Sequence, residues 1–219
     1  MALDQGTSSS RAIIYDSAGQ SVAVAQADID LVFPQDGRVE QDPDQLWQSI
    51  LAVGRQAIAE SGLVPTDIAA IGITNQRETT LLWDRATGDC VHNAVVWQDR
   101  RGAERCVAMA NETLADGRAV DAVISEATGL IIDPYFSSTK LAWLLDNVEG
   151  ARQAATNAQL CFGTVDSYLI WRLSNGRRHV TDATNASRTQ LFDINTQTWS
   201  AELLAYFDIP DTLLPEVLD

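Results

Sequence analysis

The order of extended and helical segments in the first 75 residues constrains the fold more than any other feature of the sequence. Three short strand-like runs cover residues 2–4, 11–16 and 21–29, and turn-forming residues such as Gly6 and Gly19 separate them. β-branched and aromatic residues favour strands, whereas clusters of glycine and serine favour the turns between them. The opening therefore predicts a three-stranded antiparallel meander.

A helical segment follows the meander and leads into an apolar run. Asp42 is placed to cap a helix, Pro43 suits its first position, and Gln45 lies three residues after the cap. Apolar residues then recur at helical spacing: Leu46, Trp47, Ile50, Leu51, Val53, Ala57 and Ile58. Residues 68–74 form a continuous, β-branched apolar run, which is typical of a central strand covered by helices on both faces. The intervening helix makes a crossover, so the sequence predicts an α/β fold.

The remainder of the chain is predicted to be mostly helical. Residues 79–83 and 94–97 are expected to be short strands, and residues 84–88 a turn. Expected helices cover residues 100–115, 120–128, 138–147, 150–158, 164–173 and 201–207, with Gly129 and Gly176 as stop signals. The sequence contains no repeat, low-complexity tract or linker, so residues 1–219 are expected to form one α/β domain.

Composition excludes several classes of partner. The formal net charge is -15, from 30 acidic and 15 basic residues, which argues against binding to nucleic acid or to an anionic membrane. Cys90, Cys106 and Cys161 are odd in number and far apart, so we expect reduced thiols in a cytoplasmic protein and no disulfide framework or metal cluster. The apolar stretches are too short to cross a bilayer, and the first residues lack signal-peptide character.

The turn between the first two strands has the composition of a phosphate site. Gly6 lets a ligand approach the backbone, and the amides and hydroxyls of Thr7, Ser8 and Ser9 can donate to phosphate oxygens. Arg11 adds a bidentate cation. Asp4, at the end of the first strand, is placed to hold Mg²⁺ through water. Glycine and serine are also common in ordinary hairpin turns, so taken alone the segment fits an unremarkable turn as well.

Arg77 and Glu78 follow the apolar run of residues 68–74 directly. Ligands of open α/β sheets bind beyond the carboxyl ends of strands. Arg77 can donate to hydroxyl oxygens and Glu78 can accept hydroxyl protons, which suits a small neutral polyol. A solvated ion pair at a strand end explains the same two residues equally well when they are considered alone.

Aromatic residues could supply an apolar wall for the carbon atoms of a polyol. Trp97 and Tyr135 are the candidates, with the Tyr135 hydroxyl left to form a hydrogen bond. The chain has six tryptophans, and most of them, including Trp47, Trp143 and Trp171, are expected to pack in the core. The two histidines, His92 and His179, have no partner at metal-ligand spacing, and a structural or surface role is expected for each.

Taken in order, six segments resemble the amino-terminal domain of the FGGY family of carbohydrate kinases, and within that family the glycerol kinases. They are residues 3–7 (LDQGT), 70–80 (AIGITNQRETT), 94–98 (AVVWQ), 129–140 (GLIIDPYFSSTK), 162–166 (FGTVD) and 180–189 (VTDATNASRT). The likeness covers nearly the whole chain. Residues 135–147, with Lys140, Trp143, Asp146 and Asn147, also fit the pattern of FGGY kinases in general.

The resemblance implies an α/β, ribonuclease H-like fold of the actin/Hsp70 ATPase type, with a mixed sheet, an antiparallel meander and crossover helices. It implies transfer of phosphate from Mg-ATP to glycerol, which yields sn-glycerol 3-phosphate and ADP. The implied ATP or ADP phosphate contacts are Thr7, Ser8, Ser9 and Arg11, with Asp4 near the metal. The implied glycerol contacts are Arg77, Glu78, Tyr135 and Trp97.

The resemblance also implies that this chain is one lobe of two, the substrate-side domain. In the family the general base belongs to a Gly-Asp-Gln segment beyond the point that corresponds to Asp219, and the adenine pocket belongs to the carboxyl-terminal lobe. We therefore expect no catalytic base within this chain and no turnover by the chain alone, because phosphoryl transfer depends on positioning between closed lobes. The full-length protein is expected to be a homo-oligomer.

Three positions depart from the usual family pattern. Ser8 replaces a threonine but keeps its hydroxyl, Ser138 stands where glycine is usual, and Arg38 where an aromatic residue is common. Two other functions remain open at this point. One is a non-catalytic polyol-binding or regulatory module, and the other is an FGGY kinase that acts on a different sugar.

Overall fold

The computed structural model describes residues 1–218 and contains two compact units. The first unit comprises Met1–Val32 and Gln41–Gln76, and the second comprises Phe33–Glu40 together with the chain from Arg77 onward. The sequence has no linker composition at these junctions. Each unit is described by itself.

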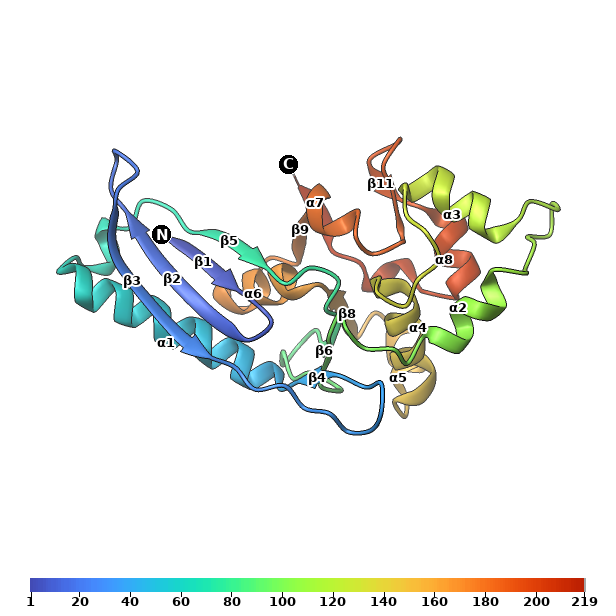
Figure 1. Cartoon of the computed structure of the whole chain (residues 1–219), viewed down its shortest axis with the longest axis horizontal. Helices are drawn as coiled ribbons and strands as arrows, with labels where there is room; N and C mark the ends of the chain where they lie inside the picture. The colour runs from blue at the N-terminus through green and yellow to red at the C-terminus, as the bar shows by residue number, and fades with distance from the viewer. Residues whose placement is uncertain (219) are drawn as a thin grey trace. The chain divides into compact units, whose positions relative to one another are not determined.

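The first unit is built on a four-stranded mixed sheet (Figure 1). Its strand order is β3-β2-β1-β5, and the bounds are β1 (Ala2–Gln5), β2 (Ser9–Tyr15), β3 (Ser21–Asp28) and β5 (Gly72–Asn75). β1 and β2 pair antiparallel, as do β2 and β3, whereas β5 runs parallel to β1. The predicted antiparallel meander is confirmed.

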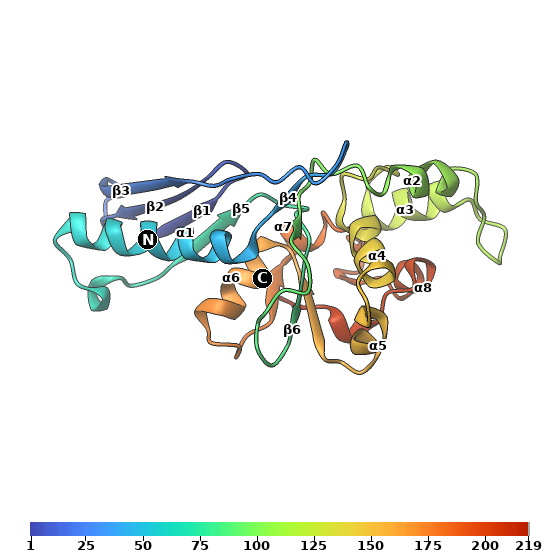
Figure 2. The same cartoon turned by 90° about the horizontal axis from the view of Figure 1, so that it is seen from below.

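Helix α1 (Pro43–Ser61) lies along one face of this sheet (Figures 1 and 2). The Asp42 side chain accepts from the Asp44 backbone nitrogen at 2.9 Å, and Gly62 ends the helix with a φ of 72°, which glycine adopts without steric cost. Its buried stripe consists of Pro43, Leu46, Ile50, Val53 and Ala57. The predicted helix and cap are confirmed, but Gln45 bonds to Asp30 instead of completing a capping box. A short 3₁₀ turn, η1 (Pro65–Asp67), leads from the helix toward β5.

The prediction of a central strand in residues 68–74 was wrong. Only Gly72–Asn75 forms a strand, and it lies at one edge of the sheet in the described part of the chain. Gly72 and Thr74 are exposed, and Ile71 is 50% exposed. A continuous apolar run does not show which neighbours will cover it, because that depends on packing between distant segments.

In the described residues, the second unit contains seven α-helices and several pairs of short strands. The strand pairs are β6 (Leu81–Asp84) antiparallel to β8 (Leu160–Gly163), β10 (Phe192–Asp193) antiparallel to β11 (Thr198–Trp199), and β9 (Val180–Asp182) parallel to β12 (Glu216–Leu218). The second unit also contains the short strand β7 (Ala94–Val95), and the two residues of β4 (Glu40–Gln41) fall one in each unit. The helices are α2 (Ala103–Met109), α3 (Val120–Thr128), α4 (Ser137–Asn147), α5 (Ala151–Thr156), α6 (Val165–Leu173), α7 (Ala183–Ala186) and α8 (Ala201–Phe207), with a 3₁₀ turn, η2 (Asp211–Leu213).

Most of the predicted helices are present, and the strands expected at residues 79–83 and 94–97 are found as β6 and β7. The other short strands of this unit were missed. Helices α3 and α8 have the predicted bounds, and Gly129 ends α3 with a φ of 70°. The helix expected over residues 100–115 covers only Ala103–Met109. Strands of two to four residues such as β8 and β10 carry too few positions to show a period of two, so the sequence could not reveal them.

A large apolar core in the second unit joins the helices to β6 and β8. It includes Leu82, Phe162, Ile124, Leu141 and Leu144, none of which is more than 3% exposed. In Figures 1 and 2, α2 to α5 and α8 gather around this core. The helices pack their apolar stripes together, so the strand pair is held from several sides.

The tryptophans divide between core and surface. Trp83 is fully buried and makes edge contacts with Tyr168, Trp171 and His179. Trp171 is buried as expected, and Trp143, although only half-buried, packs against the core of the second unit. Trp47 is also half-buried, so its predicted core position is not confirmed. His179 has a structural role, because its ring packs against Trp83 and its Nε2 atom lies 2.8 Å from the Phe162 carbonyl oxygen. Burial lowers the pKa of His179 to about 4.

The three cysteines are free thiols, and burial raises the pKa of Cys106 and of Cys161 to about 11. Within residues 1–218, no helix is long and apolar enough to cross a membrane.

Candidate functional site

Glu78 is the most constrained of the predicted polyol residues. Its side chain is only 3% exposed, and its Oε1 atom accepts from Arg188 Nε at 2.6 Å. No other described residue donates to this carboxylate, so Oε2 keeps its capacity to accept. A buried carboxylate with one fixed partner and one open oxygen is suited to hold a ligand hydroxyl.

The backbone at Glu78 adopts a conformation that is costly for a residue with a side chain. Its φ is 66°, in the left-handed region, and such a position costs on the order of 1–3 kcal/mol unless its surroundings hold it. Two hydroxyls supply that hold, since Thr80 Oγ1 and Ser137 Oγ donate to the Glu78 carbonyl oxygen at 3.1 and 3.2 Å. Strain of this kind is concentrated at functional sites.

Trp97 and Tyr135 face each other as an aromatic pair. Their ring centroids lie 5.4 Å apart with an interplanar angle of 60°, and both side chains are half-buried. The Trp97 backbone nitrogen donates to Thr79 Oγ1 at 3.3 Å, which ties the tryptophan to the residue after Glu78. Edge-to-face packing leaves apolar ring surface that can contact a carbon skeleton.

Arg188 links the carboxylate to the aromatic residues. Its guanidinium carbon lies 5.9 Å from the centre of the Tyr135 ring and 5.1 Å from that of Phe136. The same group pairs with Glu78. The structure therefore brings Glu78, Trp97 and Tyr135 into one cluster of contacts, with Arg188 as a member that the sequence had not indicated as a site residue.

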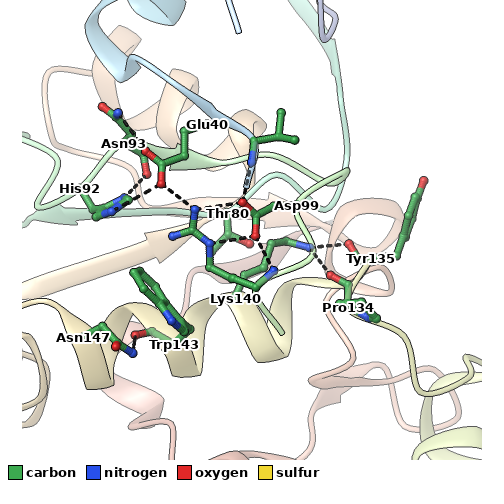
Figure 3. A network of polar contacts seen from close by, with 12 residues as sticks. Glu40, Thr80, His92, Asn93, Asp99, Pro134, Tyr135, Lys140, Trp143 and Asn147 are labelled. Carbon is green, nitrogen blue, oxygen red and sulfur yellow. Dashed lines mark hydrogen bonds and ion pairs between the residues drawn. The ribbon is translucent and has the colours of Figure 1, made fainter. Parts of the chain in front are cut away.

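Lys140 fixes the backbone of the segment that carries Tyr135. Its ammonium nitrogen donates to three successive carbonyl oxygens, at 3.0, 2.5 and 2.8 Å, which belong to Pro134, Tyr135 and Phe136. Figure 3 shows Lys140 reaching from α4 toward Pro134, while the Tyr135 ring points away from it. Burial lowers the pKa of Lys140 to about 7, although nearby carboxylates, Glu78 first, raise it.

Arg77 is exposed, in contrast to its neighbour Glu78. The alternative of a solvated ion pair between Arg77 and Glu78 does not hold in the structure, where Glu78 is buried and pairs with Arg188. Arg77 is next to Glu78 in the sequence, and the residue is exposed. The only sequence signal for Arg188 was its place in the segment of residues 180–189.

A buried ion network lies beside this cluster in the second unit (Figure 3). Asp99 accepts from Arg101 Nε at 2.8 Å and from the Val39 backbone nitrogen at 2.7 Å. Glu40 accepts from Arg101 Nη2 at 2.6 Å and from Asn93 at 3.1 Å. The three charged side chains are at most 6% exposed. The network fixes residues 39 and 40 to the loop between Trp97 and α2.

Stacking on Trp143 completes this network. The guanidinium carbons of Arg101 and Arg38 lie 4.3 and 4.9 Å from the centre of the Trp143 ring. His92 makes an edge contact with the same ring and lies 3.7 Å from Glu40. Arg38, which departs from the usual family pattern, and the half-buried Trp143 thus have a structural role.

The predicted phosphate residues lie in the first unit. Gly6 N donates to the Ser9 carbonyl at 2.9 Å and closes the turn between β1 and β2. Thr7 and Ser9 are half-buried, and Ser8 is exposed. The Ile29 backbone nitrogen donates to the Ser8 carbonyl at 2.9 Å, which holds the turn against the end of β3.

Three buried glutamines, linked by hydrogen bonds, hold the backbone of this turn. Gln76 Nε2 donates to the side-chain oxygens of Gln5 and Gln41, at 3.1 and 2.6 Å. Gln41 and Gln5 in turn donate to the carbonyl oxygens of Thr7 and Gly6, each at 2.7 Å. All three glutamines are at most 8% exposed. Sequence reasoning missed this support, because the glutamines come from three separate segments.

Arg11 lies on β2 and not within the turn. Its Nε and Nη2 atoms donate to Gln26 Oε1 on β3 at 3.1 and 2.8 Å. Across the sheet, Arg11 is in register with Gln26 on one side and Asp4 on the other, and Asp4 is in register with Thr74. Residues in register share a face of the sheet, so Asp4 and Arg11 stand side by side on the face opposite α1.

The comparisons with known proteins agree with one family. The family model for the FGGY family of carbohydrate kinases, N-terminal domain, matches residues 1–219. Glycerol kinase 1 of Pseudomonas aeruginosa is 58% identical over 219 residues, and the glycerol kinase of Alteromonas mediterranea is 54% identical over 219 residues. Each match covers 100% of this chain and 43% of the relative, so the chain spans less than half the length of these curated relatives.

Solved structures show the same fold. The crystal structure of Plasmodium falciparum glycerol kinase with ADP has a TM-score of 0.89 and 31% identity, and the match covers 98% of this chain and 42% of that chain. Gluconate kinase from Lactobacillus acidophilus has a TM-score of 0.85 at 24% identity, over 99% of this chain and 41% of that chain, which shows a shared fold alone. These matches confirm the predicted α/β ATPase-like fold. The chain belongs to the FGGY family of carbohydrate kinases and carries its N-terminal domain.

Proposed function

We propose that the protein that carries this chain transfers the terminal phosphate of Mg-ATP to glycerol, which yields sn-glycerol 3-phosphate and ADP. The observation that carries the proposal is the Glu78 carboxylate, which is buried next to Arg188 with one oxygen open, in a cluster with the Trp97 and Tyr135 rings. The high identity to glycerol kinases over the whole chain supports glycerol as the polyol.

Each group in the proposed polyol site has a role. The open oxygen of Glu78 and the exposed guanidinium of Arg77 bind glycerol hydroxyls, and the Tyr135 hydroxyl adds a third polar contact. Trp97 packs against the carbon atoms. The site holds and orients the acceptor alcohol, and alignment of this kind accounts for much of the rate enhancement of phosphoryl transfer. Proton acceptance is assigned to a residue outside this chain.

The turn of Thr7, Ser8 and Ser9 is proposed to bind the phosphates of ATP or ADP. Its backbone is held by buried glutamines, so its amides and hydroxyls are fixed before a nucleotide arrives. Arg11 supplies positive charge from the neighbouring strand. The ADP in the matched Plasmodium falciparum structure is consistent with nucleotide binding by this fold.

Magnesium is proposed to bind near Asp4. Residues 1–218 contain no cluster of three or more His, Cys, Asp or Glu side chains that could enclose a metal ion. Mg²⁺ usually takes one or two carboxylates and completes its shell with water and substrate phosphates, so the single half-buried carboxylate of Asp4 fits this mode. A bound Mg²⁺ would neutralise developing charge on the phosphates.

The cellular location and the oligomeric state of the complete protein are also proposals. A cytoplasmic location is supported by the free state of Cys90, Cys106 and Cys161, since reduced thiols are typical of that compartment. A homo-oligomeric state of the complete protein rests on the family resemblance alone.

The test is ADP release by the complete protein with glycerol, a ketopentose or gluconate as the acceptor. We expect turnover with glycerol far above that with the two sugar-derived acceptors. Arg77→Ala should raise the KM for glycerol much more than the KM for ATP, whereas the exposed Arg178→Met variant should change neither. Preferred turnover of gluconate or the ketopentose would identify another sugar kinase. Glycerol binding without turnover would favour a non-catalytic module.

A further inference from the structure

Arg188 has a fixed position in the second unit. It follows α7, and its backbone nitrogen donates to the Asn185 carbonyl at 3.0 Å. Asp182 caps that short helix by accepting from the Asn185 backbone nitrogen at 2.8 Å. The Arg188 side chain is 27% exposed, and its Nε atom carries the bond to Glu78. The cap of α7 and the hydrogen bond of the Arg188 backbone nitrogen thus fix the backbone from which the Arg188 side chain extends.

The guanidinium contacts two of the proposed ligand-binding segments at once. It binds Glu78 through a hydrogen bond and lies over the Tyr135 and Phe136 rings. In the sequence, Glu78 precedes β6 and β7, whereas Tyr135 follows them. Arg188 is more than 50 residues away from either. A planar guanidinium can form a directed hydrogen bond with its edge while its faces pack on rings, which an ammonium group cannot do.

We propose that Arg188 is a positioning residue that fixes the Glu78 carboxylate against the Tyr135 segment so that one carboxylate oxygen stays aimed at the acceptor alcohol. This inference rests on the proposed function of the Glu78 cluster. Arg188 acts through Glu78: it occupies Oε1, and Oε2 remains to accept from a ligand hydroxyl.

A positioning role differs in its consequences from two alternatives. An ion pair that only stabilises the fold would affect both substrates alike when it is broken. A guanidinium that binds glycerol itself would contribute independently of Glu78. A group that acts through Glu78 should instead lose most of its effect once the Glu78 carboxylate has been removed, because residues in direct contact are energetically coupled.

The experiment uses the complete protein and five variants: Arg188→Met, Arg188→Lys, Glu78→Gln, the double variant of Glu78→Gln with Arg188→Met, and the exposed control Arg178→Met. Glycerol dissociation constants are measured by calorimetry, and KM is measured for glycerol and for ATP. We expect Arg188→Met to raise the glycerol KM at least about tenfold, since hydrogen bonds to charged groups have about this effect, with the ATP KM within about twofold. Arg188→Lys should recover part of the loss, because it restores charge without the planar contact.

The double variant separates the alternatives. Adding Arg188→Met to Glu78→Gln should weaken glycerol binding less than about threefold further, because the two residues act as a unit. A full tenfold further loss would overturn the proposal and show direct binding of glycerol by Arg188. Equal loss for glycerol and ATP, or loss of folding in both Arg188 variants, would also overturn it, since a positioning role is selective.

The wild-type measurement distinguishes failure of the inference from failure of the proposed function. If the wild-type protein binds no glycerol, the proposed function fails and this inference fails with it. If the wild-type protein binds glycerol and Arg188→Met binds it equally well, only the role of Arg188 is overturned.

Discussion

The ammonium nitrogen of Lys140 donates to the carbonyl oxygen of Phe136 at 2.8 Å, and the two preceding carbonyl groups accept its other hydrogen bonds. Lys140 is the only lysine in the sequence, and its side chain is completely buried. Three carbonyl acceptors match the three N–H donors of an ammonium group. This residue therefore shapes the backbone that presents Tyr135.

Replacement of Lys140 by methionine is expected to destabilise the protein. The variant leaves three buried carbonyl groups without a donor, and each such group costs about 1–3 kcal/mol, offset in part because a charge no longer has to be buried. We expect a net loss of about 2 kcal/mol or more in the free energy of unfolding, measured by urea denaturation. Arg178→Met is the matched control, as it removes an exposed cation. Equal midpoints for the two variants would contradict the role given to Lys140.

Lys140 should also make stability depend on pH. Burial lowers its pKa to about 7 in the folded protein, against 10.5 as its ordinary value. Between these values the unfolded chain binds more protons than the folded one, so the free energy of unfolding should rise with pH, by up to about 1.4 kcal/mol per pH unit. The measurement is the difference between wild type and Lys140→Met from pH 7 to 8.5. A constant difference would mean that Lys140 stays charged throughout.

Local signals in the sequence predicted local structure well. Asp42 and Pro43 act through neighbours within one helical turn, and α1 begins where they indicate. The strand-favouring runs of the first 29 positions, and the turn-forming residues between them, likewise predicted the meander, because hairpin pairing is local. The edge position of β5 was not predictable in this way. An apolar run indicates that a strand forms, but it does not indicate which strands lie beside it.

The sequence predicted the candidate site residues better than it predicted which residues they contact. Glu78, Trp97 and Tyr135 were selected by residue type and by family resemblance, and the structure brings them together. The sequence offered Arg77 as the one nearby ion-pair partner for Glu78, whereas the actual partner, Arg188, is 110 positions away. Arg77 and Glu78 lie in the turn after β5, where Glu78 is buried and Arg77 is exposed, so their adjacency in the sequence was weak evidence for a pair.

The ion network of Glu40, Asp99 and Arg101 should be essential for stability. All three side chains are at most 6% exposed, and removing one member leaves an uncompensated buried charge. Arg101→Met is expected to cost about 3–5 kcal/mol in the free energy of unfolding. The control is Arg118→Met, which breaks exposed pairs with Asp116 and Glu202 and should cost less than about 1 kcal/mol. Comparable losses for the two variants in urea denaturation would contradict a special role for the buried network.

If the turn of residues 6–9 binds phosphate as proposed, its glutamine support predicts a selective effect on nucleotide binding. Gln41 donates to the Thr7 carbonyl and accepts from Gln76, so Gln41→Leu removes both bonds at nearly constant volume. The turn should lose its fixed geometry, because the carbonyl of Thr7 and the amide of Gln76 each lose a buried partner.

We expect Gln41→Leu to raise the KM for ATP by about tenfold or more in the complete protein, with the KM for glycerol changed less than about threefold. Gln56→Leu is the matched control, since Gln56 is exposed on α1 and donates to Glu60 on the same helix. A steady-state titration of each substrate at saturating levels of the other makes the comparison. If Gln41→Leu leaves the ATP KM at the level of the Gln56 control, the turn does not depend on its glutamine support. In that case the phosphate site must be sought outside residues 6–9.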